Sequence, residues 1–347
     1  MHHLSNLRSF FRRHLAQGLL GVTFIVSFPL ASAQTETPLP APVIHSSSRG
    51  KDKGVVILKN PAADTVIRYT LDGTEPNKNS GPYLAPIALP FGGTVKARAF
   101  SQDRKRSSVT VASTIAATRP GTPPPNTLVP VTQDRDFPIY DWATRHNAVR
   151  AQVKTRKPRL IFVGDSITQM FGGEPHDRTQ PGRAVWEKFY GHRQAANLGF
   201  GYDFVENTLW RLQHGELDGA KAKVAVVLIG TNNSGKNTAE EIATGVRAIC
   251  DELRSRQRGV KILLLGILPR SAKPDAGRAK VAEVNKLLAK FDGRNGVTYL
   301  DLWHKFLAPD GSISREIMSD FLHPTERGYQ IWAEAMEPTL AKMLGEK

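Results

Sequence analysis

A serine placed between an apolar run and a helix start is the first residue in this chain whose position suits chemistry. Ser166 lies in Gly-Asp-Ser-Ile-Thr (164–168), directly after the apolar run 160–163. Where a buried strand turns toward a helix, such a hydroxyl lies at the carboxyl edge of the sheet, beside the free N–H groups of the helix. That position suits a nucleophile, although Gly-Asp-Ser is also a common turn. Asp165 fits the same motif as the residue that orders the turn rather than as a reacting group.

An acid and a histidine follow much later, just before the last expected helix. Asp320 and His323 are three residues apart in Asp-Phe-Leu-His. One short turn can bring the carboxylate to the imidazole, fix its tautomer and leave the other ring nitrogen to take a serine proton. A surface Asp–His pair is the alternative interpretation of this spacing.

Two further turns could supply donors to an oxyanion. Asn232, in Gly-Thr-Asn-Asn (230–233), follows the apolar run 224–229 directly. Its amide could hold a tetrahedral oxyanion, an interaction worth about 2.7–4 kcal/mol in the transition state, or could simply close the strand. The turn 197–203 is rich in glycine and opens a helix, so its main-chain N–H groups are natural anion donors.

Past residue 137 the chain alternates between apolar runs of strand length and segments with a helical pattern. Runs such as 224–229 and 262–265 are typical of parallel strands that are covered on both faces. Helices are expected near 140–155, 183–191, 203–213, 238–257, 276–291 and 324–344. Strands are expected near 158–163, 194–198, 223–229, 260–267 and 297–301. The alternation predicts a doubly wound α/β domain over 137–345.

The preceding region has a different character. Residues 42–116 carry short β-type runs separated by turn residues, and this pattern predicts a small antiparallel β-sandwich. The expected strands are 54–58, 66–70, 86–89 and 94–100. Residues 117–136 contain five prolines and are expected to form a semi-rigid linker between the two domains.

The first 33 residues have the pattern of a secretory signal. A basic start with three arginines precedes an apolar stretch over 18–30 and then Ala-Ser-Ala at 31–33. We expect cleavage after Ala33 and a secreted or periplasmic mature protein; an uncleaved anchor is the alternative. An Arg-Arg pair leaves the twin-arginine route open. Because no other segment has the length of a membrane helix, no stable membrane anchor is expected.

Composition excludes several other classes of function. The net charge of +15 favours anionic partners, but the basic residues are scattered and form no nucleic-acid motif, so no nucleic-acid partner is expected. The single cysteine, Cys250, lies in an apolar pattern typical of a core residue. We expect no metal site and no cofactor, because the histidines of the second domain lack metal-ligand spacing. These histidines are His146, His176, His192, His214 and His304.

The order of the serine, the glycine turn, the asparagine and the Asp–His pair resembles that of the GDSL, or SGNH, hydrolases. The resemblance covers about 155–345 and is strongest at 208–212, 215–217, 230–233 and 265–270. Those strings are similar to the catalytic-subunit branch of the platelet-activating-factor acetylhydrolases. The resemblance implies a flavodoxin-like, three-layer α/β/α fold and the removal of small acyl groups, chiefly acetyl. It is also compatible with a homodimer.

The same resemblance implies a role for each residue type. Ser166 would be the nucleophile, His323 the general base and then acid, and Asp320 the acid that orients the histidine. The amide of Asn232 and the main-chain N–H of Ser166 would be oxyanion donors.

One position departs from that branch. Its members carry a glycine immediately before the aspartate of the second block, where this chain has Tyr202. A main-chain N–H survives the substitution, so the third donor is either Tyr202 or Gly201, and the tyrosine ring could narrow the acyl pocket.

Residues 171–182 are expected to form a loop beside the nucleophile, either as a connector or as a control on substrate access.

The front domain has a resemblance of its own. Residues 69–76, Tyr83 and 94–100 are similar to the C-terminal Ig-like domain of chitobiases and hexosaminidases. That family implies an accessory domain of secreted carbohydrate-active proteins, without catalytic residues. Tyr69 and Tyr83 could contact sugar or could pack within the sandwich.

Together these features predict a secreted serine esterase that removes short acyl groups, chiefly acetyl, from a carbohydrate through an acyl-enzyme. A lipid or phospholipid acetylhydrolase of the same fold is the alternative within the class. An alternative of another class is a catalytically silent carbohydrate-binding surface protein, against which the complete set of catalytic residue types argues.

Overall fold

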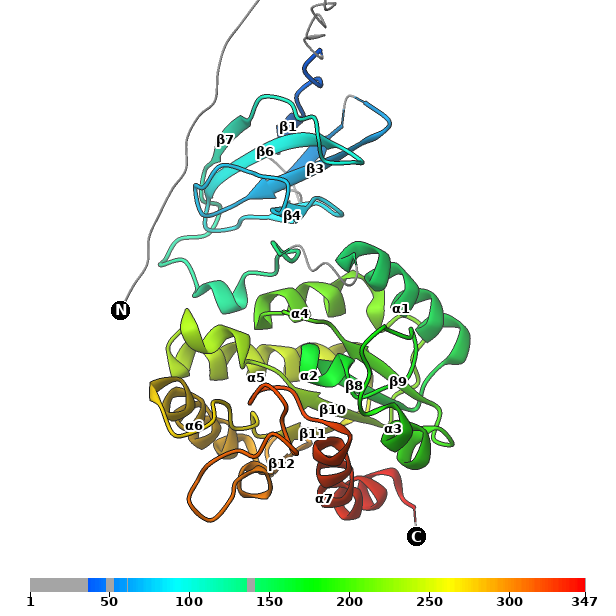
Figure 1. The fold of residues 1–347 in the computed structure, drawn as a ribbon. Coiled ribbons are helices and arrows are strands. Elements are labelled where there is room, and N and C mark those ends of the chain that lie inside the picture. Colours follow the sequence, from blue (N-terminus) through cyan, green and yellow to red (C-terminus); the bar gives the residue numbers. More distant parts are fainter. Residues whose placement is uncertain (1–36, 48–52, 61, 136–140, 347) are drawn as a thin grey trace, which may run out of the picture. The chain divides into compact units, whose positions relative to one another are not determined.

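The computed structural model describes residues 37–47, 53–60, 62–135 and 141–346. The predicted signal peptide, residues 1–33, lies outside the described residues, as do the last residue of the linker and the first residues of the second domain. The order of the elements agrees with the sequence: β-strands come first, and alternating strands and helices follow (Figure 1).

The described residues of the front region form seven strands in two antiparallel sheets. One sheet has the order β1-β2-β5 and the other has the order β4-β3-β6-β7. The sequence missed β1, β4 and β7, of which β4 has only two residues. The strand bounds are Val43–Ser46 (β1), Val55–Lys59 (β2), Thr65–Thr70 (β3), Gly81–Pro82 (β4), Ile87–Ala88 (β5), Gly93–Ser101 (β6) and Val111–Ile115 (β7).

Alternation along the front strands explains their shared core. Val56 and Leu58 of β2 pack in one apolar cluster with Val95 and Ala97 of β6, so both sheets turn a face to the same interior. Tyr69 is buried there, and its ring meets the ring of Tyr83 edge-on at 6.4 Å between centroids. For Tyr69 the structure therefore supports the packing role.

The second domain is built on a five-stranded parallel sheet with the order β12-β11-β10-β8-β9. In chain order this is the 2-1-3-4-5 arrangement of flavodoxin-like folds, which confirms the predicted doubly wound sheet. Its topological switch point lies between β8 and β10, where ligands of such sheets bind. The strands are Leu160–Gly164 (β8), Ala195–Gly199 (β9), Val224–Leu228 (β10), Lys261–Leu265 (β11) and Val297–Leu300 (β12).

Helices cover both faces of this sheet, as the near-continuous apolar runs require (Figure 1). Alternate residues of β8 belong to different cores. Ile161 and Val163 lie in the core to which α1, α4, α5 and α6 contribute, whereas Leu160 and Phe162 lie in the core to which α3 and α7 contribute. The helix bounds are Trp142–Arg156 (α1), Ser166–Gln169 (α2), Arg183–Tyr190 (α3), Val205–Arg211 (α4), Ala239–Arg256 (α5), Ala276–Leu288 (α6) and Glu326–Leu344 (α7). The predicted strands and long helices are thus confirmed within a few residues.

Part of the segment predicted to be a linker is packed against the second domain. Residues 126–128 form a short 3-10 helix, and Thr127 donates a hydrogen bond to the main-chain oxygen of Glu241 at 2.8 Å. Thr132 and Gln133 are also buried. The proline pattern correctly predicts a segment without long helix or strand, but it carries no information on this docking.

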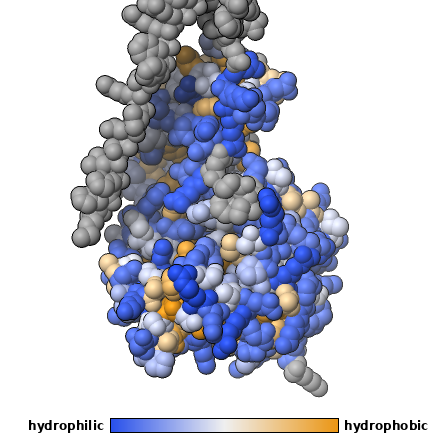
Figure 2. All heavy atoms as spheres, in the orientation of Figure 1, coloured by the Kyte–Doolittle hydropathy of each residue, from blue (hydrophilic) through white to orange (hydrophobic). Residues whose placement is uncertain are grey.

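Large apolar side chains are mostly interior. The face of the molecule visible in Figure 2 is largely hydrophilic, with apolar residues in small separate areas. Of the large apolar or aromatic side chains that are exposed in the described part of the chain, only Tyr202 belongs to the second domain, at 38% exposure. Among the helices of the described residues, none has the length and apolarity needed to cross a membrane.

Candidate active site

Ser166 is the first residue of the short helix α2, immediately beyond β8. Asp165 caps this helix, because its carboxylate accepts the main-chain N–H of Ile167 at 3.0 Å. Gly164 must lack a side chain here, since a Cβ would lie 2.2 Å from the main-chain oxygen of Leu228 on the neighbouring strand. Ser166 therefore lies at the carboxyl edge of the sheet, at the end of β8, as the sequence predicts.

Ser166, His323 and Asp320 form one hydrogen-bonded line. The serine Oγ lies 2.9 Å from Nε2 of His323, and Nδ1 of the same ring lies 2.6 Å from Oδ2 of Asp320. The second carboxylate oxygen, Oδ1, accepts the main-chain N–H of His323 at 2.8 Å. This geometry places a proton acceptor on the serine and an orienting carboxylate on the far ring nitrogen.

The environment keeps the orienting carboxylate charged. Burial acts to raise the pKa of Asp320, but the hydrogen bonds that His323 donates outweigh it, so the pKa lies below its ordinary value. The side chain of Asp320 is 54% exposed and that of His323 is 23% exposed. An ionised Asp320 holds Nδ1 in its protonated form, which leaves Nε2 to accept the serine proton.

The turn after β9 brings Gly201 and Tyr202 to the serine. Both residues line one cavity with Ser166 and His323. Tyr202 has a φ of 62°, in the left-handed region that glycine enters freely and other residues enter at a cost of about 1 kcal/mol. A glycine at this position would adopt the same backbone without that cost. The guanidinium of Arg135 lies 5.3 Å from the centre of the Tyr202 ring.

Gly201 and Tyr202 differ as candidate oxyanion donors. The main-chain N–H of Gly201 donates to Oε1 of Gln169, and its oxygen accepts Nε2 of Gln133 at 2.8 Å. The N–H of Gly201 is thus engaged within the protein.

Asn232 lies at the end of the neighbouring strand β10, on the other side of the switch point from β9. It begins a 3-10 helix, and its Nδ2 donates to the main-chain oxygen of Asp203 at 3.0 Å. The asparagine is thereby held against the residue that follows Tyr202. Its amide carries two N–H groups, so one bond to the protein leaves a second for a ligand.

A buried charge network lies directly behind this turn. Arg211 donates from Nε to Asp203 at 2.7 Å and from Nη1 to Glu216, and all three side chains are fully buried. His146 adds a contact of 2.9 Å between Nδ1 and Glu216, and His214 stacks on Trp210. Both histidines thus make their contacts within the second domain. The network secures the turn that carries Tyr202.

The cavity at Ser166 is small. It has a volume of about 50 Å³, and residues 171–182 contribute Asp177 and Thr179 to its wall. A water molecule occupies about 30 Å³ and a 150 Å³ cavity accommodates benzene, so this space suits a group of two or three heavy atoms. The segment 171–182 therefore shapes the pocket, and is more than a connector.

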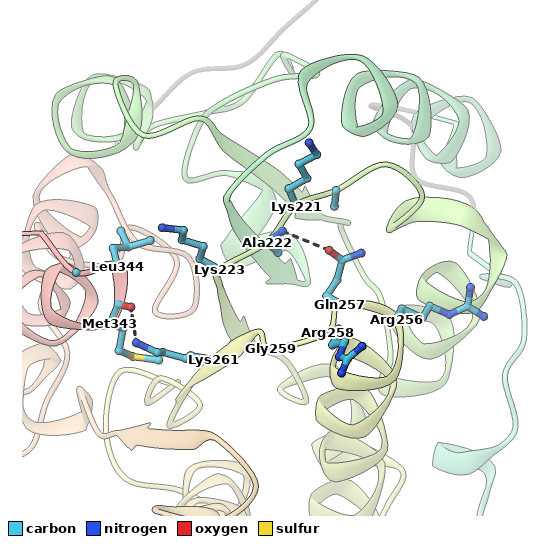
Figure 3. Close-up of a pocket in the computed structure, with 12 residues that line it drawn as sticks. Lys221, Ala222, Lys223, Arg256, Gln257, Arg258, Gly259, Lys261, Met343 and Leu344 are labelled. Atoms are coloured by element: carbon cyan, nitrogen blue, oxygen red, sulfur yellow. Dashed lines mark hydrogen bonds between the residues drawn. The ribbon is translucent and has the colours of Figure 1, made fainter.

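A second hollow of about 640 Å³ lies at the opposite edge of the sheet and contains no candidate catalytic residue (Figure 3). It is lined by residues at the starts of β10 and β11 and by the end of α7, including Lys221, Lys223 and Lys261.

Among the described residues no group of three or more His, Cys, Asp or Glu side chains could hold a metal ion. Burial raises the pKa of Cys250 to about 12, in keeping with its core position.

The structure therefore places Ser166, His323, Gly201 and Tyr202 around one cavity, with Asp320 hydrogen-bonded to His323. Asn232 is connected to this group by its hydrogen bond to Asp203, the residue after Tyr202. Sequence reasoning missed Gln133, Gln169 and Asp177, which contact or line the site. Gln169 lies one helical turn after the serine and could have been suspected from that spacing. The other two come from the segment predicted to be a linker and from a Gly- and Pro-rich loop, where nothing in the pattern marks them.

Comparison with known proteins agrees with this geometry. Residues 162–331 match the model of the GDSL-like lipase/acylhydrolase family, and residues 56–114 match that of the Fn3-associated family. The chain is 38% identical over 206 residues to the human and rat platelet-activating factor acetylhydrolase IB subunit alpha2, covering 59% of this chain and 86% of each relative. It is 34% identical over 206 residues to the human alpha1 subunit, covering 85% of that relative.

Relatives at this identity, covered over most of their length, share the fold of this chain. The serine, the turn after β9, the asparagine and the Asp–His pair all lie within the matched region. The chain belongs to the GDSL-like lipase/acylhydrolase family.

Proposed function

We propose that this protein is a serine esterase that removes short acyl groups, chiefly acetyl, by way of an acyl-enzyme. The observation that carries the proposal is the line of Asp320, His323 and Ser166 ending in a cavity of about 50 Å³. The nucleophile, the base and a space of acyl size meet at one point. The hydroxyl has one base within 2.9 Å, which satisfies the geometric requirement for a general base.

In the acylation step Ser166 Oγ attacks the ester carbonyl while His323 Nε2 takes the hydroxyl proton. The carbonyl oxygen becomes an oxyanion held by the main-chain N–H groups of Ser166 and Tyr202 and by the amide of Asn232. His323 then gives its proton to the leaving alkoxide, and an acyl-serine remains. Asp320 stays ionised throughout and stabilises the imidazolium.

In the deacylation step water takes the place of the alcohol. His323 removes a proton from the water, the hydroxide attacks the acyl carbonyl, and the same donors hold the second oxyanion. Return of the proton to Ser166 Oγ releases the carboxylic acid. The cycle consumes one water and needs no further co-reactant.

The size of the cavity supports an acetyl group over longer acyl chains. Met170, Thr179 and Tyr202 line the space beside the serine. Each further methylene needs room for another carbon, so a longer chain has to extend out of this cavity or displace a residue of its wall. The relatives named platelet-activating factor acetylhydrolase are named for the same acyl group.

For the alcohol part of the ester we propose a carbohydrate. This proposal rests on the resemblance of the front region to accessory domains of carbohydrate-active proteins, and thus on a companion domain rather than on the site. The second candidate is a phospholipid-type acetyl ester, which the names of the relatives favour. We also propose export, on the pattern of residues 1–33.

A release assay tests the chemistry and the substrate together. The purified protein is given acetylated xylan, acetylated amino sugars and a short-chain acetyl phospholipid, and free acetate is measured beside the hydrolysis of para-nitrophenyl acetate. We expect acetate release by the wild type and none above background by Ser166→Ala. Equal rates for the two proteins would overturn the nucleophile assignment. Faster release from the phospholipid than from every sugar would replace the carbohydrate proposal by the second candidate.

A further inference from the structure

Gly201 is held at both of its peptide groups by two buried glutamines. Its N–H donates to Oε1 of Gln169, and its C=O accepts Nε2 of Gln133 at 2.8 Å. Gln169 is 5% exposed and Gln133 is 2% exposed, so neither side chain can exchange these contacts readily for water. Rotation of either peptide plane at Gly201 would break a buried hydrogen bond, which costs more than one at the surface.

The second of these peptide planes carries the proposed oxyanion donor. Because a trans peptide is planar, the N–H of Tyr202 points opposite to the C=O of Gly201. Fixing the direction of that C=O therefore fixes the direction of the N–H. The restraint matters here because Tyr202 has a φ of 62°, which its side chain disfavours.

The amide of Gln169 has a single orientation that suits its neighbours. Its Nε2 donates to Oδ2 of Asp177, and the same oxygen accepts Nη1 of Arg145 at 2.9 Å. A carboxylate can only accept and a main-chain N–H can only donate. A flipped amide would place two donors together at Gly201 and two acceptors together at Asp177, so Asp177 sets the direction of the amide.

The amide of Gln133 is oriented in the same way. Its Nε2 donates both to the oxygen of Gly201 and to Oδ1 of Asp203, each at 2.8 Å. Both partners are acceptors, so only the NH₂ group can face them. Asp203 is in turn held by Arg211 Nε at 2.7 Å. Each glutamine is thus fixed by a carboxylate that is itself paired with an arginine.

We propose that Gln133 and Gln169 are positioning residues that clamp Gly201 and aim the main-chain N–H of Tyr202 at the developing oxyanion. Gln133 lies outside the matched region 162–331, so a residue of the segment between the two domains completes the catalytic centre. The proposal rests on the proposed esterase function and adds two residues to its machinery.

The first test is Gln169→Glu, followed across pH. When ionised, this glutamate faces Asp177 and repels it, which disturbs the clamp. When protonated, its O–H can donate to Asp177 while its C=O accepts the N–H of Gly201, so the glutamine pattern is restored. We expect kcat for para-nitrophenyl acetate to be 10–100-fold below wild type at pH 8, with KM within about threefold.

The decisive quantity is the ratio of variant to wild-type kcat, because the ratio cancels the pH dependence that both proteins share. We expect this ratio to rise at least tenfold between pH 8 and pH 5.5. A ratio that is low but independent of pH would mean that Gln169 matters only for packing, and would overturn its assigned role. Tryptophan fluorescence at each pH verifies that the variant is folded.

The second test is Gln133→Met, which keeps the length of the side chain and removes its donors. We expect a 10–100-fold loss of kcat with little change in KM, which is smaller than the 10²–10³-fold loss found when a whole oxyanion donor is removed. Because both glutamines act on one N–H, Gln133→Met combined with Gln169→Glu should lose less than the product of the single losses at pH 8. A fully multiplicative loss would contradict a shared target.

Gln194→Glu is the matched control, since Gln194 is an exposed glutamine immediately before β9, at the opposite edge of the sheet from Ser166. It should keep wild-type kcat at every pH. Wild-type kcat in both Gln133→Met and Gln169→Glu would overturn the clamp while leaving the esterase intact. A wild type that hydrolyses none of the esters would instead overturn the proposed function.

Discussion

The acid beside the nucleophile should make the stability of the second domain fall as pH rises. Asp165 is 1% exposed, its Oδ1 accepts the N–H of Ile167, and its Oδ2 has no hydrogen-bond partner among the described residues. Burial, with a smaller contribution from the charge of Asp203, raises the pKa of Asp165 from an ordinary value of 3.8 to about 7. The folded state therefore holds this proton more tightly than the unfolded chain does.

The size of the effect follows from this difference in pKa. Between pH 4 and pH 7 the folded protein binds more protons at Asp165 than the unfolded chain, so the free energy of unfolding decreases as pH rises. The full difference, at 1.36 kcal/mol per pKa unit, amounts to about 4 kcal/mol and is complete above pH 7. For a domain of this size it corresponds to roughly 10 °C in Tm.

The perturbation that isolates this effect is Asp165→Asn. The asparagine keeps an oxygen for the N–H of Ile167, and asparagine is as good an N-cap as aspartate. Urea unfolding is followed by tryptophan fluorescence at pH 4, 5, 6, 7 and 8. All five tryptophans lie within 137–345, so the signal reports the second domain alone.

The compared quantity is the free energy of unfolding of the wild type minus that of the variant, which cancels the other titrating groups. A constant offset from the new amide does not matter, because only the change with pH is used. We expect this difference to fall by about 4 kcal/mol from pH 4 to pH 8. A difference that stays level across this range would refute the reasoning and would show that Asp165 is ionised in the folded protein.

Three further substitutions test other parts of the site. Asn232→Ala should lower kcat by about 10²–10³ with little change in KM, measured by steady-state kinetics; an unchanged kcat would remove the asparagine from the oxyanion site. Tyr202→Gly should relieve the backbone strain and open the cavity, so the rate on butyryl relative to acetyl para-nitrophenyl esters should rise at least fivefold; an unchanged ratio would exclude the ring as the limit on chain length. Arg211→Met should destabilise the second domain by about 3–5 kcal/mol in urea unfolding, because it leaves Asp203 and Glu216 buried without their cation. A loss below 1 kcal/mol would contradict the role assigned to the network.

The fold class was accessible from the sequence because local patterns carried it. Apolar runs such as 160–163 and 224–229 are continuous only where both faces of a strand are covered. The turns that follow these runs indicate which residues lie at the carboxyl edge of the sheet. No local pattern predicts strand β4, which has only two residues. None predicts that residues 126–133 pack against the second domain either. Their positions depend on partners that are distant in the chain, such as Glu241 and Gly201.

The sequence by itself determined the residue types of the candidate site and their order. Ser166, Asn232 and the Asp320–His323 pair each follow or precede an element whose pattern is strong, so their common location followed from strand order at the switch point. Only the tertiary structure revealed Gln133, Gln169 and Asp177 and the hydrogen bonds that the two glutamines make to Gly201. The physical reason is that a hydrogen bond between side chain and main chain depends on direction and on the neighbouring charges. Residue types and their spacing in the sequence predict neither that direction nor those neighbouring charges.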